Sequence, residues 1–300
     1  MFEKKTIQGA YFAIAAYSFW GFVPIYFKSI EHVNVIEIIS HRVIWSVALL
    51  FIILAVKKEL PTLRVTGHQL MLLGTTALLL SINWLVFIYG ILSNNIIETS
   101  LGYFINPLVS VFLGMIFLKE TLRPLQWVAI AIAATGIIFQ LVFFGAVPWI
   151  ALTLAFSFGF YGLIRKNLNL PSIPGLMIEN LILLPMAFIA IYWVHQSEGL
   201  SFGTINIETN ILLMLGGFVT SFPLLCFAAA VTRLSLTAAG MFQYLAPSLS
   251  LIVAIVIYDE PFTLDRIITF LCIWIALIIF TLEAFNYHGR ISKRPGFVAN

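Results

Sequence analysis

Charged residues are scarce in this chain. Asp, Glu, Lys and Arg make up 10% of its 300 residues, whereas apolar residues make up 61%. Soluble domains are about one quarter charged, and so few charges could not cover the surface of a folded soluble domain. The composition therefore predicts an integral membrane protein.

The net charge is small and the chain has few cysteines. The formal net charge is only +3 and its carriers are scattered, so we expect no nucleic-acid partner. The two cysteines, Cys226 and Cys272, both lie in apolar stretches. This position favours helix packing over a disulfide or a metal pair, and we expect neither a metal nor a cofactor.

Two catalytic signatures are missing. The sequence has no H-E-x-x-H zinc motif and no Walker A loop, which argues against a zinc protease and an ATP-driven pump. A buried pair of acids would still allow an intramembrane enzyme acting on a lipid-soluble substrate. We keep that enzyme as the alternative to a transporter, which is the interpretation we favour.

Long apolar runs fill most of the chain. A bilayer core needs about 20 apolar residues per helix, and the connections between the runs leave no room for another folded domain. The sequence thus predicts an all-α integral membrane protein with ten transmembrane helices, near residues 8–27, 34–56, 69–91, 97–118, 125–142, 147–165, 174–194, 210–231, 236–258 and 267–286.

Lys and Arg are distributed unevenly between the two ends of these spans. Nearly all of them fall on the side of the N-terminus, and the opposite side holds only Lys28 and Arg266. Since cytoplasmic loops carry the excess of Lys and Arg, both termini are expected in the cytoplasm.

The two halves of the chain resemble each other at an offset of 140 positions. Pro107 then falls on Pro247, Ser110 on Ser250 and Glu120 on Glu260. Five helices is an odd number, so the second half enters the membrane inverted. We expect a first repeat over 1–142, a second over 143–288 and a cytoplasmic tail over 289–300, an arrangement typical of carriers that work by alternating access.

Polar and aromatic residues within the spans are the candidates for a solute site. Trp20, Trp84 and Tyr103 lie deeper than the aromatic belt at the membrane surface, and a charged residue inside a membrane is costly enough to suggest a function. The alternative is a tightly packed helix interface. The substrate-binding candidates are Tyr17, Trp20, Arg42, Asn83, Trp84, Tyr103, Asn106, Ser157, Tyr161, Gln243 and Tyr244. At least three of Trp20, Trp84, Tyr103, Tyr161, Gln243 and Tyr244 are expected to line one central space.

Three further residues are candidates for proton coupling. Glu37 and His41 share one face of the second span, and Glu179 lies within the seventh. Arg42 and Glu179 differ by about 10 Å in depth, too far for a static pair. We hypothesise that Glu37 and His41 take up a proton, with Glu179 as the next candidate; the alternative is that these residues only hold helices together.

Five segments carry a resemblance to a known family: HRVIWS (41–46), SINWLVFIYG (81–90), SLGYFINPLVSVFLGMIFLKE (100–120), SFGFYGLIRK (157–166) and FQYLAPSLSLIVAIVIYDEPF (242–262). They resemble the RarD branch of the EamA-type drug/metabolite transporters. The resemblance implies a permease of the bacterial inner membrane, with five plus five inverted helices, that exports its solute. The branch name is associated with chloramphenicol, which makes that drug a candidate solute.

The small number of charged residues inside the spans narrows the range of possible solutes. Relatives that carry sugar phosphates need several buried cations, and here Arg42 is the only cation well inside a span. An uncharged, zwitterionic, weakly acidic or amphipathic drug or metabolite, such as chloramphenicol or an amino acid, fits better. The expected partners are this solute and the lipid bilayer, and the sequence leaves the oligomeric state open.

Overall fold

The structure is a computed structural model that describes residues 2–93, 95–144, 147–168, 170–259 and 264–292. All regular secondary structure in these ranges is helical. The elements are α1 (Phe2–Ser29), α2 (Val35–Val56), η1 (Leu60–Leu63), α3 (Gly67–Leu92), α4 (Ile96–Leu118), α5 (Pro124–Phe144), α6 (Trp149–Asn167), α7 (Ser172–Ser197), α8 (Ile207–Val231), α9 (Leu236–Gln243), α10 (Leu245–Tyr258) and α11 (Leu264–Ser292).

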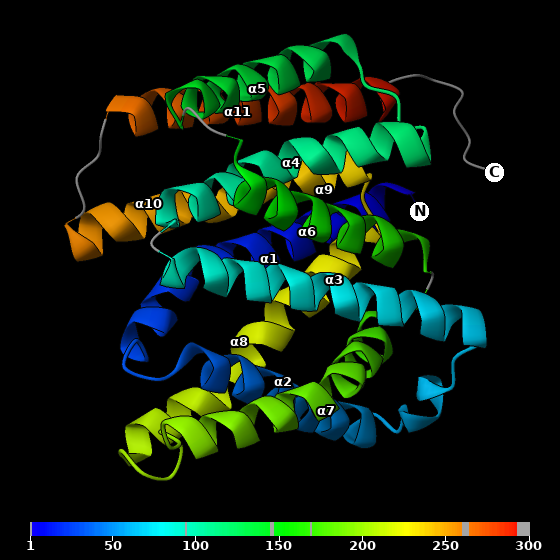
Figure 1. Cartoon of the computed structure of the whole chain (residues 1–300). Helices are drawn as coiled ribbons and strands as arrows, with labels where there is room; N and C mark the ends of the chain where they lie inside the picture. Colours follow the sequence, from blue (N-terminus) through cyan, green and yellow to red (C-terminus); the bar gives the residue numbers. More distant parts are fainter. Residues whose placement is uncertain (1, 94, 145–146, 169, 260–263, 293–300) are drawn as a thin grey trace.

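The helices run back and forth between two ends of one bundle (Figure 1). Eight segments in the described part of the chain are long and apolar enough to cross a membrane, with α9 and α10 together forming one of them. α6 and α11 run between the same two ends. The chain is therefore an all-α membrane protein with ten transmembrane helices, as the sequence predicts. We call the end where α1 begins the N-terminal face and the opposite end the distal face.

The ninth span is broken in its middle. α9 ends at Gln243 and α10 begins at Leu245. Pro247 has no N–H to offer the carbonyl of Gln243, so one hydrogen bond of a regular helix is lost at this point. Pro107, its counterpart in the first half, lies inside the uninterrupted α4.

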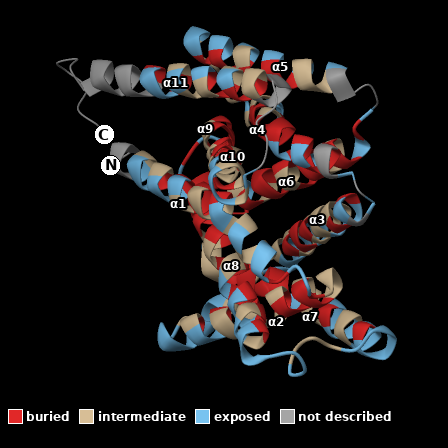
Figure 2. Cartoon of the chain, turned by 90° about the vertical axis from the view of Figure 1, so that its left-hand side faces the viewer, coloured by how far each residue is buried: buried red, intermediate tan, exposed pale blue. Residues whose placement is uncertain are grey.

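Eight of the ten spans form a closed ring. Along this ring α1 packs against α8, α8 against α2, α2 against α7, α7 against α3, α3 against α6, α6 against α4, and α4 against α9, while α10 packs against α1 and closes it. α5 and α11 pack against each other at one side of the ring, as Figure 2 shows in a view from the distal face. Exchanging each helix of the first half with its counterpart in the second reproduces this set of contacts, which is the pattern of two inverted repeats.

The offset of 140 positions is visible in the backbone. Lys119 and Asp259 both follow the last residue of a helix and both have a left-handed φ of 52°. The amide of Lys119 bonds the carbonyl of Gly114, and the amide of Asp259 bonds the carbonyl of Ala254. The two halves thus end their fourth spans with the same turn in the same register.

Candidate functional site

Arg42 lies on α2 inside the ring. Its Nε donates a hydrogen bond of 2.7 Å to Thr220 Oγ1 on α8. Its guanidinium carbon lies 4.9 Å from the ring centroid of Trp84 on α3 and 5.6 Å from that of Phe27 on α1. Tyr103 on α4 is close enough to interact electrostatically with the guanidinium. These five residues, which come from α1, α2, α3, α4 and α8, are called the Arg42 site.

Glycine allows α2 and α8 to meet closely beside this site. A Cβ at Gly216 would lie 3.1 Å from Cγ of Arg42, and a Cβ at Gly217 would lie 2.4 Å from the backbone carbon of Trp45. Ser46 Oγ donates a hydrogen bond to the carbonyl of Gly217. The stem of Arg42 is therefore fixed against α8, while its charged end points away from this contact towards Trp84.

The charged end of Arg42 has no counter-charge. Arg42 forms no ion pair within the described ranges. The bond from Nε to Thr220 is the only hydrogen bond of its side chain there, which leaves the two Nη nitrogens without a partner, and the residue is partly exposed. Tyr103 is 49% exposed, and because it is close enough to interact electrostatically with the guanidinium, we interpret this surface as facing the interior of the ring rather than lipid.

The site lies well inside the membrane span. At a rise of 1.5 Å per residue, Arg42, Trp84 and Tyr103 each lie about 10–12 Å from the distal ends of their helices. Three residues that the sequence placed in a solute site thus lie close together at one depth.

An aromatic cluster fills the ring on another side. It joins α1, α6 and α8 through Tyr17, Trp20, Phe158, Tyr161 and Phe227, with ring centroids 4.9–6.3 Å apart. Tyr161, Phe227 and Tyr17 are at most 2% exposed, whereas Trp20 is partly exposed. Tyr17 and Tyr161 therefore pack within the protein core, whereas Trp20 and Phe158 keep some exposed surface.

Asn83 and Ser157 connect two helices. Asn83 Nδ2 donates to Ser157 Oγ and to the carbonyl of Leu154, both at 3.0 Å, and so fastens α3 to α6. Both acceptors lie on α6. Asn83 and Ser157, which the sequence predicts to bind solute, therefore bond each other between two helices. Their hydrogen bonds serve helix packing.

Asn106, Gln243 and Tyr244 are also buried. Gln243 Nε2 donates to Ser110 Oγ between α9 and α4, and Tyr244 is fully buried at the break before α10. Gln243 Oε1, Asn106 Oδ1 and the Tyr244 hydroxyl have no hydrogen-bond partner within the described residues. Of the six residues expected around one space, Trp84 and Tyr103 share the Arg42 site, and the expectation for the whole set stays a prediction.

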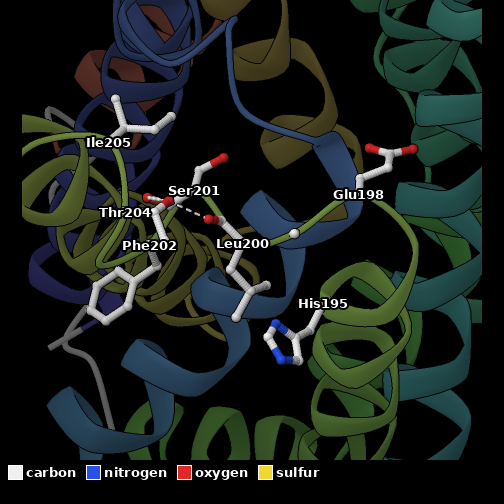
Figure 3. A pocket seen from close by; sticks show the side chains of 8 residues that line it. His195, Glu198, Leu200, Ser201, Phe202, Thr204 and Ile205 are labelled. Carbon is white, nitrogen blue, oxygen red and sulfur yellow. Dashed lines mark hydrogen bonds between the residues drawn. The ribbon is translucent and has the colours of Figure 1, made fainter.

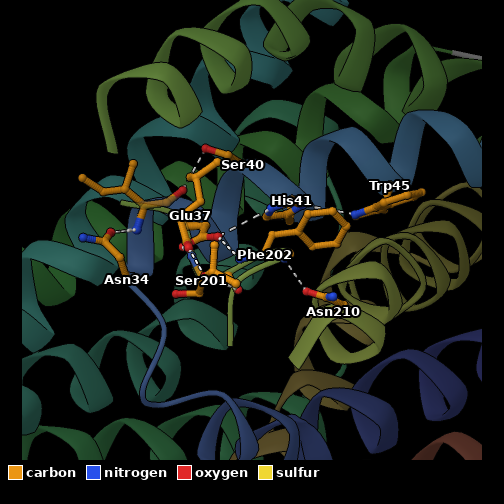
Figure 4. A network of polar contacts seen from close by, with 12 residues as sticks. Asn34, Glu37, Ser40, His41, Trp45, Ser201, Phe202 and Asn210 are labelled. Atoms are coloured by element: carbon orange, nitrogen blue, oxygen red, sulfur yellow. Dashed lines mark hydrogen bonds and ion pairs between the residues drawn. The ribbon is translucent and has the colours of Figure 1, made fainter. Parts of the chain in front are cut away.

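The Glu37–His41 pair lies near the distal face (Figure 4). The Glu37 carboxylate accepts hydrogen bonds from the backbone N–H groups of Ser201 and Phe202, at 3.0 and 2.8 Å. His41 Nε2 lies 3.8 Å from Glu37 Oε1, and Trp45 Nε1 donates to His41 Nδ1. Glu37 therefore holds the loop between α7 and α8, a contact between positions far apart in the sequence.

This loop also lines a hollow of about 650 Å³ at the distal face (Figure 3). Its walls are formed by the end of α7 and residues 198–205. Thr204 donates a hydrogen bond to the carbonyl of Leu200 within the loop. None of the sequence-predicted site residues lines this hollow, which we assign to loop packing.

Glu179 lies in a second polar cluster, fully buried in α7. Its carboxylate accepts a hydrogen bond of 2.6 Å from Thr76 on α3 and one of 3.4 Å from Tyr161 on α6. Arg165 Nη1 lies 3.6 Å from Glu179 Oε1. These four residues are called the Glu179 cluster, and no ion pair joins it to Arg42.

Arg165 is a buried residue that sequence reasoning missed. Arg165 lies only two positions before the end of α6, where the sequence predicts that a cation is exposed at the membrane surface. In the structure Arg165 is only 3% exposed. Gly175 provides the room, since a Cβ there would lie 2.0 Å from Arg165 Nη1. Gly175 is the one feature of the sequence that reflects this burial, and no sequence pattern links Gly175 to Arg165.

Glu120 joins the two halves at the N-terminal face, and Lys166 joins α6 to the end of α8 within the second half. Glu120 accepts hydrogen bonds from the backbone N–H groups of Leu236 and Thr237 at the start of α9, at 2.6 and 2.9 Å. Lys166 Nζ donates to the carbonyls of Val231 and Leu234. An anion thus caps a helix N-terminus and a cation caps a helix C-terminus, as the helix dipole favours.

Glu98 makes a similar contact at the distal face, where its Oε1 accepts a hydrogen bond from the backbone N–H of Ile150 at the start of α6.

Among the residues that the structure describes, no cluster of His, Cys, Asp and Glu could hold a metal ion.

The model of the EamA-like transporter family matches the chain twice, over residues 7–142 and 146–282. The chain belongs to the EamA-like transporter family. An uncharacterized transporter of Vibrio cholerae serotype O1 is 46% identical over 295 residues and covers 97% of each chain. Protein RarD of Escherichia coli strain K12 is 44% identical over 296 residues, which are 98% of this chain and 100% of that protein. This similarity confirms the resemblance to the RarD branch.

The fold is also found among solved structures. A crystal structure with 15% sequence identity superposes with a TM-score of 0.73 over 93% of this chain and 99% of that chain. The EamA-type chain is thus a multi-pass bacterial membrane protein of a transporter family, and the names of its relatives point away from an enzyme.

Proposed function

We propose that this protein is a secondary-active transporter that binds one small amphipathic solute at the Arg42 site and moves it by alternating access. The observation that carries the proposal is Arg42 itself. Its guanidinium lies inside a membrane-spanning ring, its Nη groups are unpaired within the described residues, and the rings of Phe27 and Trp84 lie beside it. Such a cation is costly in hydrocarbon, and a solute pathway gives it access to water and ligand.

The difference between the two ends of the ring supports alternating access. Four of the five residues of the Arg42 site keep exposed surface, Thr220 being the buried one, whereas the Glu179 cluster and the aromatic cluster bury Tyr161 completely nearer the N-terminal face. This arrangement corresponds to a carrier open towards its distal face and closed at its N-terminal face. Because the two halves are inverted repeats, the opposite state follows when each half adopts the conformation of the other.

The charge distribution supports an orientation. The N-terminal face carries most of the Lys and Arg residues of the sequence, so we place it in the cytoplasm. In a bacterial inner membrane the distal face would then open to the outside, as expected of an exporter that has just released its solute. The candidates for solute are chloramphenicol, other amphipathic drugs and amino acids.

Proton exchange is the coupling we propose. The chain has no Walker A loop, so an ion or solute gradient must supply the energy. Glu37, His41 and Glu179 are the residues within spans that we propose to exchange a proton. Glu37 and His41 lie towards the distal face and Glu179 towards the N-terminal face, so the two groups lie on opposite sides of the solute.

Flux into proteoliposomes tests this function. The purified protein is reconstituted, and uptake of labelled chloramphenicol, amino acids and aromatic acids is followed with and without an imposed proton gradient. We expect saturable flux of at least one solute, faster when protons can move in the opposite direction. Empty liposomes and a denatured sample provide the controls. Absence of flux for every solute with folded protein would contradict the proposal, and product formation without flux would indicate the enzyme instead.

A further inference from the structure

We propose that Arg42 binds the carboxylate of a solute that carries a single negative charge and an aromatic body. This inference rests on the proposed transport function and names the substrate class of the same site. It narrows the candidates from amphipathic molecules in general to aromatic monocarboxylates without an amino group.

The first argument is charge. Among the arginines whose side chains the structure describes, the other two that lie largely inside the protein have a carboxylate beside them: Arg165 Nη1 lies 3.6 Å from Glu179, and Arg123 Nη2 lies 2.6 Å from Glu283. Arg42 has none among the described residues. One bound carboxylate would supply the missing counter-charge, whereas the two charges of a phosphate monoester would exceed it.

The second argument is the geometry of the donors. A guanidinium presents its N–H groups as a planar fork that matches both oxygens of a carboxylate. In Arg42 only Nε is occupied, by Thr220. Trp84 and Phe27 lie within 5.6 Å of the guanidinium carbon and restrict its orientation through cation–π contacts. The two Nη groups remain free to bind both oxygens of one acid.

The third argument concerns the rest of the solute. Trp84 and Tyr103 supply aromatic surface beside the guanidinium, and the Phe87 ring lies 6.1 Å from that of Tyr103. Such walls favour an aromatic body through apolar burial and ring contact.

An amino group would find no partner here. Glu37, five positions before Arg42 on α2, already accepts two backbone hydrogen bonds from the loop between α7 and α8. An α-ammonium group would therefore be desolvated without a carboxylate to receive it, which is unfavourable. The site should select an aromatic acid over the corresponding amino acid.

Three probes of similar shape separate these contributions. 3-Phenylpropionate carries the acid alone, phenylalanine carries acid and amine, and 3-phenylpropan-1-ol carries no charge. Their binding to wild-type protein in nanodiscs is measured by calorimetry at pH 7. We expect 3-phenylpropionate to bind at least about tenfold more tightly than each of the other two, because charged hydrogen bonds of this kind contribute at that scale.

Two variants assign the preference to Arg42. Arg42→Gln should weaken binding of 3-phenylpropionate about tenfold or more while changing that of the alcohol less than about threefold. Arg42→Lys keeps the charge but loses the fork, so its affinity should fall between. Arg233→Gln is the matched control, since Arg233 also lies over an aromatic ring, that of Phe12 at 5.2 Å, outside the Arg42 site.

Each outcome decides the inference. Equal wild-type affinity for the acid and the alcohol would overturn it, even if no Arg42 variant folds, and so would an unchanged preference in a folded Arg42→Gln protein. Tighter binding of phenylalanine than of 3-phenylpropionate would overturn the selection against amines and with it the substrate class. If another solute is transported while 3-phenylpropionate does not bind, the subsite is wrong and the transporter stands. If nothing is transported, the proposed function itself fails.

Discussion

The indole N–H of Trp45 donates a hydrogen bond of 3.1 Å to Nδ1 of His41. An indole nitrogen can only donate, so Nδ1 must accept, and the neutral imidazole carries its hydrogen on Nε2. That nitrogen faces Glu37 Oε1 at 3.8 Å. Protonation of His41 would place a second hydrogen on Nδ1 and break the bond to Trp45. Trp45 is therefore an obstacle to proton uptake by His41.

A change of Trp45 tests this relationship. In Trp45→Phe the competing donor is gone, while an aromatic ring remains to pack against Phe202, whose centroid lies 6.3 Å from that of Trp45. If His41 protonation drives transport, the pH of half-maximal proton-driven flux should rise in this variant, because the charged imidazole no longer costs a hydrogen bond. The measurement is solute flux in proteoliposomes across a pH series.

The control for this series is His41→Asn, which cannot titrate. With His41 as the coupling residue, this variant loses the pH dependence and Trp45→Phe no longer shifts it in the double variant. Equal pH profiles for wild type, Trp45→Phe and His41→Asn would show that the pair is structural and would move the coupling to Glu179.

Gly217 controls the approach of α2 to α8. A Cβ there would lie 2.4 Å from the backbone carbon and 2.6 Å from the carbonyl oxygen of Trp45, and backbone atoms cannot move aside independently. We predict that Gly217→Ala destabilises the folded protein by about 1–3 kcal/mol, the usual cost of overpacking. Thermal unfolding of the detergent-solubilised protein measures the loss.

Gly74→Ala is the matched comparison. Gly74 also lies in a membrane-spanning helix, α3, but a Cβ there would meet no atom within 4 Å. Since alanine is a better helix former than glycine by about 1 kcal/mol, this variant should be as stable as wild type or more so. Equal melting temperatures for both alanine variants would show that α2 and α8 can separate freely.

Glu120 is expected to stabilise the join between the two halves. Both of its carboxylate oxygens accept backbone N–H groups at the start of α9. Glu120→Gln would turn an –NH₂ group towards one of these donors, at a cost of about 1.5–3 kcal/mol for a lost charged hydrogen bond. The melting temperature should fall accordingly. Glu31→Gln, which removes an exposed partner of Lys28, should leave it nearly unchanged, and a similar fall in both variants would refute the role of Glu120.

The ten spans and the inverted repeat could be predicted from the sequence because they depend on local properties. The length of each apolar run predicts a helix. The offset of 140 positions between the two halves is detectable in matching residues such as Pro107 and Pro247. The structure shows the same offset at Lys119 and Asp259, which share their left-handed φ. Helix number and register are therefore encoded along the chain.

The roles of polar residues within the spans could not be predicted in the same way. Arg42 and Asn83 are both polar and both inside helices, yet Arg42 makes one side-chain hydrogen bond and keeps free donors, while Asn83 bonds α6. Glu37 bonds Phe202, 165 positions away. The role of each polar residue depends on which helix it contacts in the folded ring. A single sequence does not show which residues become neighbours in space.

The buried pair of Arg165 and Glu179 gives the last prediction. Glu179→Gln alone leaves a charged Arg165 whose Nε and Nη1 have no hydrogen-bond partner within the described residues. Removing one member of a buried pair typically costs about 3–5 kcal/mol, so we expect this variant to unfold at a clearly lower temperature. Arg165→Met alone should also destabilise, since it leaves the Glu179 carboxylate with only two hydroxyl donors, Thr76 and Tyr161.

The double variant Arg165→Met/Glu179→Gln removes both charges together. The desolvation cost of an unpaired ion then disappears, and the double variant should be less destabilised than the sum of the two single variants, by about 1 kcal/mol or more. The exposed Lys28–Glu31 pair provides the comparison, since its two substitutions should add without coupling. Strict additivity at Arg165 and Glu179 would mean that the two residues do not stabilise each other. The Glu179 cluster would then hold α3, α6 and α7 together through the hydrogen bonds of Thr76 and Tyr161 alone.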